Sequence, residues 1–204
     1  MSFDLAARTW DNDKRAERAN RIAAEIGRHI PEGRKSAMEF GCGTGLLSFF
    51  LADTFDEITL IDSSRGMIEV LTEKISGAAV KNMVPLWIDL TDEEYAGKKF
   101  DALYSSMAYH HVRDTERITA ILFDLLSDGG CACIVDLDEE DGSFHSNKPF
   151  YDGHNGFDRE ALCRIFSEAG FINVSASTFY HSTKEIGDRQ IPYSLFLLYA
   201  EKPA

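Results

Sequence analysis

The chain has 204 residues, of which 44% are hydrophobic, enough for one domain with a substantial core and too few for two. Its formal net charge is −13, from 34 acidic and 21 basic residues, and no run of Lys or Arg forms an electropositive track. Nucleic-acid backbones and anionic lipid surfaces are bound through clustered positive charge, so we expect neither a nucleic acid nor a membrane as a partner.

The first predicted element is an amphipathic helix over residues 12–30, with apolar side chains at helical spacing, ending near Pro31. Three arginines lie largely on another face of this helix, and we interpret them as a solvated face: Arg15, Arg18 and Arg21.

Short apolar runs then alternate with longer amphipathic ones. The predicted strands are 36–41, 57–61, 83–88, 100–105 and 129–136. The predicted helices are 44–53, 64–77 and 114–127, with a shorter one around 91–96. Strands that alternate with helices are typical of a parallel sheet covered on both faces. The predicted fold class is therefore α/β, a doubly wound, Rossmann-like domain.

The last third of the chain predicts a closing strand pair. A capped helix at 158–169 is ended by Gly170, and two apolar runs follow at 171–179 and 192–200. The connection between these runs is too short for a comfortable parallel crossover, so we expect them to pair antiparallel. The result is a seven-stranded, mostly parallel sheet.

The cysteines predict a reducing environment. Cys42, Cys131, Cys133 and Cys163 form no CxxC pair, and the first residues lack the apolar core of a signal peptide. We therefore expect a cytoplasmic protein. Cys131 and Cys133 lie two apart in an apolar run, which favours core packing over a redox or metal pair. No apolar stretch approaches the roughly 20 residues of a membrane helix.

The stretch EFGCGTG, residues 39–45, follows the first predicted strand and carries glycines at 41, 43 and 45. In an open α/β sheet, ligands lie at the carboxyl ends of the strands, next to the first one. Glycines there allow a sharp turn and a close approach to a ligand, and the helix that follows directs free N–H groups to the same place. This loop is the predicted ligand site.

Two ligand classes use this layout. A dinucleotide needs G-x-G-x-x-G, whereas the spacing here is G-x-G-x-G. Glu39, two residues before the first glycine, would oppose a diphosphate and attract an ammonium group. Asp62, at the end of the second predicted strand, could accept hydrogen bonds from two ribose hydroxyls, which both ligand classes carry.

The segments EFGCGTG, LIDSS and FDALYSSMAYHHVRD, in that order, resemble the successive signature segments of class I S-adenosylmethionine-dependent methyltransferases, particularly the small-molecule subgroup. The resemblance covers nearly the whole chain and includes the final strand pair. It implies S-adenosyl-L-methionine as cofactor and S-adenosyl-L-homocysteine as product.

The resemblance also implies the cofactor contacts. The methionine part would be held by Glu39, Gly41, Cys42, Gly43, Thr44 and Gly45, the adenosine by Asp62, Ser63 and Met67, the adenine amino group by Asp89 with Leu90 beside it, and the reactive end would lie near Ser105 and Ser106. Alternatives remain for three of these residues. Asp89 could be a turn residue, Met67 a core residue, and Cys42 only a small residue that fits.

Candidate catalytic and substrate residues follow the fourth predicted strand, where Tyr109, His110 and His111 occur. Methyl transfer is an in-line displacement that depends on alignment and exclusion of water, and it needs a base only if the nucleophile arrives protonated. We name His110 and His111 as candidate general bases, with packing and hydrogen bonding as the alternative.

Two further regions could contact a substrate. The long connection 136–158 carries His145, Tyr151, Asp152 and His154, and it could form a pocket wall or a polar surface loop. We expect no metal site, because His145, Asp152 and His154 lack tight ligand spacing. In relatives, an N-terminal segment often folds over the cofactor as a lid; Trp10 could lie there, or anchor the first helix.

The resemblance divides the single domain into an N-terminal helical cap (1–33), a cofactor-binding half (34–136), a substrate loop (137–157), and a helix with the closing strands (158–204). The predicted function is methyl transfer from S-adenosylmethionine to the oxygen, nitrogen or carbon atom of an unidentified small molecule. A nicotinamide-dependent dehydrogenase and a non-catalytic cofactor-binding partner subunit are the alternatives. The oligomeric state stays open.

Overall fold

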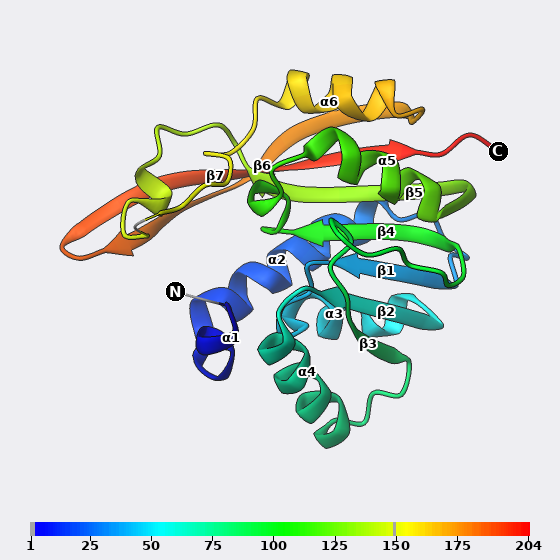
Figure 1. Ribbon diagram of the computed structural model, residues 1–204, viewed down its shortest axis with the longest axis horizontal. Helices are drawn as coiled ribbons and strands as arrows, with labels where there is room; N and C mark the ends of the chain where they lie inside the picture. Colours follow the sequence, from blue (N-terminus) through cyan, green and yellow to red (C-terminus); the bar gives the residue numbers. More distant parts are fainter. Residues whose placement is uncertain (1–2, 149) are drawn as a thin grey trace.

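The computed structural model describes residues 3–148 and 150–204, and within them seven strands form one sheet in the order β3-β2-β1-β4-β5-β7-β6 (Figure 1). The strands are β1 Ser36–Phe40, β2 Glu57–Asp62, β3 Met83–Trp87, β4 Phe100–Ser106, β5 Leu126–Leu137, β6 Ile172–Ile186 and β7 Arg189–Glu201. β1 to β5 are paired parallel, and β7 pairs antiparallel with both β5 and β6. The predicted α/β fold with a closing antiparallel pair is confirmed.

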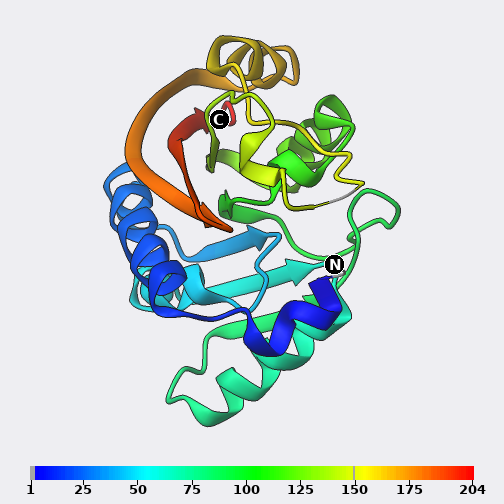
Figure 2. The ribbon, with the colours of Figure 1, turned by 90° about the vertical axis from the view of Figure 1, so that its left-hand side faces the viewer.

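Helices cover both faces of this sheet. They are α1 Phe3–Ala6, α2 Asp13–His29, α3 Leu46–Leu51, α4 Arg65–Gly77, α5 Thr115–Leu125 and α6 Arg159–Glu168, with 3₁₀ turns η1 Ala7–Thr9, η2 Ala52–Thr54, η3 Tyr109–His111 and η4 Ser143–His145. Figure 2 shows α2 on one side of the sheet and α5 and α6 on the other. No helix in the described ranges is long and apolar enough to cross a membrane.

Two hydrophobic clusters hold these layers together. One cluster joins α2, α3 and α4 to one face of the sheet, called here the first face, and the other cluster joins α5 and α6 to the opposite face. Because successive side chains of a strand alternate between faces, Cys131 and Cys133 of β5 enter the first cluster while Ala132 enters the second. Both cysteines are free and completely buried, which confirms their prediction as core residues.

The structure corrects two predicted elements. Residues 91–96 form no helix, because the Asp89 carboxylate accepts hydrogen bonds from the Thr91 amide and hydroxyl and closes a turn. The sequence predicted a polar connection between the last two strands. In the structure, most of that stretch belongs to the two strands themselves, which are longer than predicted. β6 continues to Ile186 and β7 begins at Arg189, so most of the polar stretch pairs with itself across a tight turn at Gly187.

Candidate functional site

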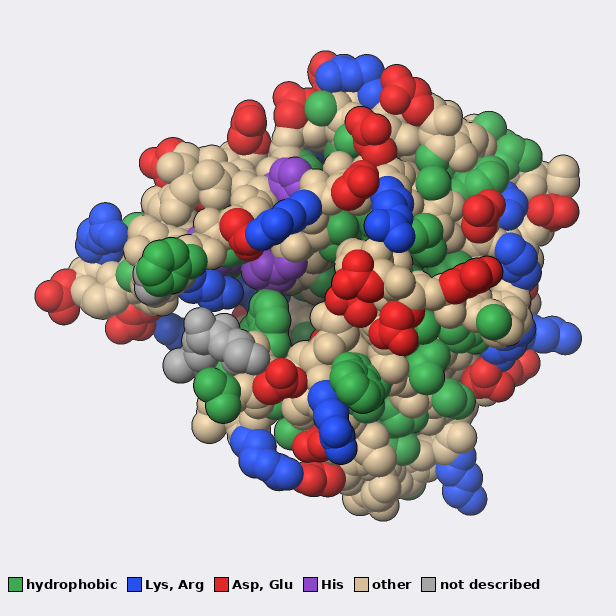
Figure 3. All heavy atoms as spheres, viewed as in Figure 1, with side chains coloured by type: hydrophobic (Ala, Val, Ile, Leu, Met, Phe, Trp, Pro, Cys, Tyr) green, Lys and Arg blue, Asp and Glu red, His purple; other side chains and the backbone are tan. Residues whose placement is uncertain are grey.

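A cavity of about 560 Å³ opens at the carboxyl ends of the central strands. The loop after β1, residues 41–45, is called here the glycine loop. The cavity lining combines residues 41–44 of this loop with the ends of β2 and β4, and α2 and the segment before it contribute a further wall. Figure 3 shows a hollow on this face with histidine side chains beside it. The cavity lies where an open α/β sheet places its ligands.

The glycine loop is shaped by close packing and by positive backbone angles. Gly41 has φ +70°, and a Cβ there would lie 2.3 Å from the Cβ of Ala108. Gly43 has φ +54°, and its backbone lies beneath the Trp10 ring, since a Cβ would reach within 3.7 Å of Nε1. Glycine is therefore required at Gly41 by space and at both positions by conformation.

Asp62 fixes this loop from the neighbouring strand. Its Oδ2 accepts a hydrogen bond of 2.7 Å from the Gly43 amide, and its Oδ1 accepts one of 2.8 Å from the Ser64 amide. Burial raises the pKa of the carboxyl group, and the two backbone N–H groups oppose that rise. Asp62 thus holds the loop in position while it lines the cavity.

Glu39 is the most deeply buried acid of the cavity wall, with only 2% of its surface exposed. The Ser48 hydroxyl donates to its carboxylate, and Ser48 in turn contacts the Tyr104 hydroxyl at 2.6 Å. Burial raises the pKa of Glu39 to about 8, and the nearby Asp62 charge adds to the rise. This acid would be stabilised in its ionised form by a cationic group placed in the cavity.

Asp89 lines the cavity at the end of β3, but its side chain also serves the turn at Thr91 described above. The turn role weighed for this residue is therefore observed. Leu90 and Met67 line the cavity as well and are nearly fully buried, so Met67 serves the core and the cavity together.

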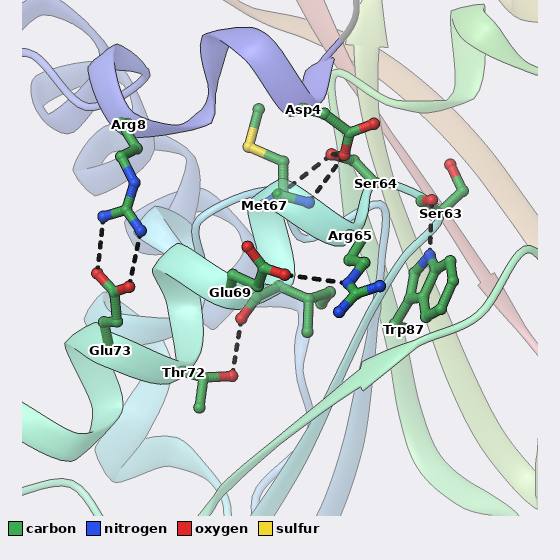
Figure 4. Close-up of polar contacts among 12 residues, drawn as sticks. Asp4, Arg8, Ser63, Ser64, Arg65, Met67, Glu69, Thr72, Glu73 and Trp87 are labelled. Atoms are coloured by element: carbon green, nitrogen blue, oxygen red, sulfur yellow. Dashed lines mark hydrogen bonds and ion pairs between the residues drawn. The ribbon is translucent and has the colours of Figure 1, made fainter.

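The N-terminal segment, residues 3–11, closes one side of the cavity by docking on α4 (Figure 4). The Asp4 carboxylate accepts hydrogen bonds from the Ser64 hydroxyl and the Gly66 amide, and Arg8 makes a two-pronged contact to Glu73 at 3.0 and 2.9 Å. These contacts carry Phe3 and Trp10 to the cavity wall.

The end of the N-terminal segment is fastened to the glycine loop itself. Asp11 accepts a hydrogen bond from the Thr44 hydroxyl and pairs with Lys74 at 2.7 Å. Lys74 also donates to the Thr44 carbonyl at 2.7 Å. The glycine loop and the N-terminal segment are therefore joined by direct hydrogen bonds and by Lys74, which contacts both.

The arginines of α2 differ from the solvated face expected for them. Arg15 and Arg18 line the cavity, and the Arg15 guanidinium lies 4.1 Å from the centre of the Trp10 ring. Arg21 is exposed and pairs with Glu17, as expected. The helical spacing did not separate the two groups because only the fold shows which part of the polar face meets the N-terminal segment.

The histidines after β4 fall in different environments. His111 lines the cavity, whereas His110 is 1% exposed and contacts the Asp136 carboxylate through Nδ1 at 2.6 Å. His145 is 4% exposed, lies 5.8 Å from His111 between ring centres, and stacks on Tyr151 at 3.8 Å. Burial lowers the pKa of His111 and of His145 to about 3, with the neighbouring His110 contributing, so both rings are neutral near pH 7.

Most of the predicted site residues line this one cavity: Trp10, Glu39, Gly41, Cys42, Gly43, Thr44, Asp62, Ser63, Met67, Asp89, Leu90, Ser106 and His111. Others lie outside its lining for clear reasons. Gly45 faces Leu71, the Ser105 hydroxyl donates to the Phe40 carbonyl, and Tyr109 is a core residue beside Thr119.

Among the residues not predicted for the site, Arg15, Arg18 and Asp136 stand out. His154 was predicted for the site, but its Nε2 donates a hydrogen bond of 2.9 Å to the Val112 carbonyl. Asp136 had a usable signal, since it lies one residue before the end of β5, much as Asp62 ends β2.

Comparison with known proteins agrees with this arrangement. A family model described as a methyltransferase domain matches residues 12–176. A Schizosaccharomyces pombe protein named an uncharacterized methyltransferase is 31% identical over 153 residues, which are 68% of this chain and 54% of that protein. Phosphoethanolamine N-methyltransferase 1 of Triticum aestivum is 28% identical over 151 residues, 72% of this chain and 30% of the wheat protein. This chain thus spans about half of the first relative's length and less than a third of the second's.

Solved structures repeat the fold. Phosphoethanolamine N-methyltransferase 2 of Haemonchus contortus, in complex with phosphomonomethylethanolamine and S-adenosylhomocysteine, superposes with a TM-score of 0.75. The match covers 91% of this chain and 53% of that one at 16% identity, so it shows a shared fold. Because the family model spans most of its length, this chain belongs to the methyltransferase domain family.

Proposed function

We propose that the chain binds S-adenosyl-L-methionine in the cavity and transfers its methyl group to a small molecule, releasing S-adenosyl-L-homocysteine. The observation that carries this proposal is the buried carboxyl group of Glu39 on the wall beside an open glycine loop. Its pKa is raised to about 8 by burial, and the ammonium group of the cofactor's methionine part is a cation that would restore its charge.

The rival ligand, a nicotinamide dinucleotide, suits this cavity less well. Its diphosphate would lie on the glycine loop, and Glu39 lines the cavity together with that loop. A buried acid at this place offers a diphosphate no positive charge and would repel it once ionised, whereas the same acid attracts the ammonium group of S-adenosylmethionine. Asp62 suits the ribose of either ligand, so the choice between them rests on Glu39. In this pose Asp62 keeps its hydrogen bonds to the loop and uses its remaining lone pairs for the ribose.

The acceptor end of the cavity, in this proposal, is the end walled by His111 and the N-terminal segment. Tyr151, from the segment after residue 149, contacts that wall, since its ring centre lies 5.7 Å from that of His111. A wall made partly by docked segments favours a small molecule over a polymer. Of the two adjacent histidines, His111 is the one on the cavity wall, so we place it and not His110 next to the acceptor.

Thermal unfolding with S-adenosylmethionine, S-adenosylhomocysteine and NAD tests the choice of cofactor. We expect both methionine-derived ligands to raise the midpoint, because a ligand that binds only the folded state stabilises it, and NAD to leave it unchanged. A rise with NAD alone would support the dehydrogenase. Release of S-adenosylhomocysteine with a panel of small amines, phenols and carboxylic acids then tests turnover, and a chain that binds without turnover would be the non-catalytic partner.

A further inference from the structure

Three histidine side chains converge beside the cavity, and we call His110, His111 and His145 the histidine cluster. One ring nitrogen from each lies within 4.8 Å of the others. Two of these residues belong to η3, after β4, and the third belongs to η4, in the connection from β5 to α6. The cluster therefore depends on the tertiary fold, and His111 links it to the cavity.

The first of the three rings is held by a buried carboxylate. Asp136, which is fully buried, contacts His110 Nδ1 through one oxygen at 2.6 Å and the His110 amide through the other at 3.1 Å. The Leu137 amide donates to Asp136 as well, at 2.7 Å. This contact assigns the ring proton to Nδ1 and leaves Nε2 as a lone-pair donor, the arrangement of a metal-bound histidine with its outer carboxylate.

The third ring supplies an independent observation. Nδ1 of His145 is buried and has no hydrogen-bond partner among the described residues. Buried polar atoms are normally paired, and an unpaired one destabilises the fold by about 1–3 kcal/mol. The ring is stacked on Tyr151, whose hydroxyl is engaged by the carbonyl groups of His110 and His154. Both the orientation of His145 and its open nitrogen are thus built into the fold.

We propose that His110, His111 and His145 bind a divalent transition-metal ion, with Zn²⁺ the best match, at the acceptor end of the cavity. Three imidazole nitrogens are a donor set that suits zinc, and they leave a fourth tetrahedral position open. Calcium and magnesium are poor matches because they prefer oxygen ligands. The three ligand nitrogens lie within 4.8 Å of one another, so they must draw closer together around the bound ion.

The surrounding charges indicate what occupies the open position. The Lys148 and Lys184 ammonium groups act on His111 and His145 and disfavour a bare dication, while the Asp136 carboxylate, in contact with His110, favours it. A metal whose open position holds an anionic oxygen, from hydroxide or from an acceptor, satisfies both sets of charges. That role of the metal towards an acceptor rests on the proposed function; the metal site itself does not.

This site differs from the residue trio considered in the sequence. His145 was weighed there with Asp152 and His154, and no metal was expected. In the structure Asp152 pairs with Arg113, and His154 Nε2 donates to the Val112 carbonyl. The partners of His145 are instead two residues far away along the chain.

Cobalt absorption tests the site directly. The full chain is stripped with a chelator and titrated with Co²⁺, which absorbs visibly in a tetrahedral site, and Zn²⁺ is then added as competitor. We expect a visible band that Zn²⁺ removes. His145→Ala should weaken Co²⁺ binding by at least about tenfold, and Asp136→Asn, which alters only the positioning carboxylate, by roughly 10–100-fold. His181→Ala, on an exposed position of β6, is the matched control and should bind as the wild type.

The absence of a Co²⁺ band in the folded wild type, or an unchanged band in folded His145→Ala, would overturn the proposal. His111→Ala, a change at a partly exposed residue, gives the same test if His145→Ala fails to fold. Calorimetric titration of S-adenosylmethionine into the same samples separates this proposal from the proposed function. Cofactor binding without metal binding would overturn only the metal site, and metal binding without cofactor binding would overturn only the proposed cofactor.

Discussion

The glycine loop and the histidine cluster occupy neighbouring parts of one site but are built in different ways. The loop is continuous in sequence, and its partner Asp62 lies at the end of the adjacent strand β2. The cluster takes its residues from two separate connections, and its supporting Asp136 comes from β5. The first region follows from the parallel sheet alone, while the second depends on how a long connection folds back.

The glycine loop is determined by the common fold, whereas the histidine cluster depends on a connection that can vary between proteins of the same fold. In the proposed function, backbone amides, glycines and strand-end carboxylates would bind the cofactor, which is the same for any acceptor. Side chains of long connections contact the part that does change, which is the acceptor. Substitutions in the glycine loop should therefore alter folding and cofactor binding, and substitutions in the cluster should alter metal or acceptor binding.

The largest effect is expected from Gly41→Ala. The added Cβ would lie 2.3 Å from Ala108, at φ +70°, so left-handed strain and overpacking together should lower the free energy of unfolding by about 2–5 kcal/mol. Gly27→Ala adds the same methyl group in α2 with no atom within 4 Å, and it should raise stability by about 0.5–1 kcal/mol. Urea unfolding of both variants measures this contrast, and equal stabilities would mean that the loop is placed differently.

Glu39→Gln probes the buried charge. The pKa of Glu39 in the folded, ligand-free protein is about 8, above its ordinary value of 4.5, so the folded state keeps a proton that the unfolded chain loses. The associated stability is fully present below about pH 4.5 and is lost as pH rises through about 8.

Between these pH values, the unfolding free energy of the wild type should fall relative to Glu39→Gln, by up to about 1.4 kcal/mol per pH unit. Denaturant unfolding of both proteins at several pH values gives the difference. Parallel stability curves would show that Glu39 is ionised without a ligand.

Asp62→Ala should weaken binding of S-adenosylmethionine by about 1.5–3 kcal/mol, because the glycine loop loses a charged hydrogen-bond acceptor and the ribose would lose another. Asp56→Ala, an exposed acid just before the same strand, is the control and should bind normally. Calorimetry reports both affinities. Unchanged affinity in a folded Asp62→Ala protein would remove this carboxylate from the site.

The smallest effect is expected from Arg8→Ala, which removes the exposed contact between the N-terminal segment and Glu73. We expect cofactor affinity to fall no more than a few-fold, with the difference from wild type shrinking in high salt as surface charges are screened. Arg21→Ala removes a similarly exposed pair on α2, with Glu17, as control. A large loss with Arg8→Ala would mean that this contact alone holds the segment over the cavity.

The sequence predicted the sheet and many residues that line the cavity around the glycine loop because both depend on short-range patterns. Alternating strands and helices, the glycines after β1 and the acid after β2 each occur within one predicted element. Arg15 and Arg18 were misassigned, since the helical period marks a polar face but not what packs on it. Asp136 and the histidine cluster escaped prediction because residues 110 and 145 meet only after the β5 connection folds back over η3.

We infer that Glu39 and the glycine loop hold an amino acid and nucleoside ligand. Calorimetric titration of the purified wild-type chain with S-adenosylmethionine and, separately, with S-adenosylhomocysteine tests this most directly. We predict micromolar binding of both, since they share the ammonium and ribose groups assigned to Glu39 and Asp62. Binding of neither by a folded chain shown to be free of carried-over ligand would contradict the claim.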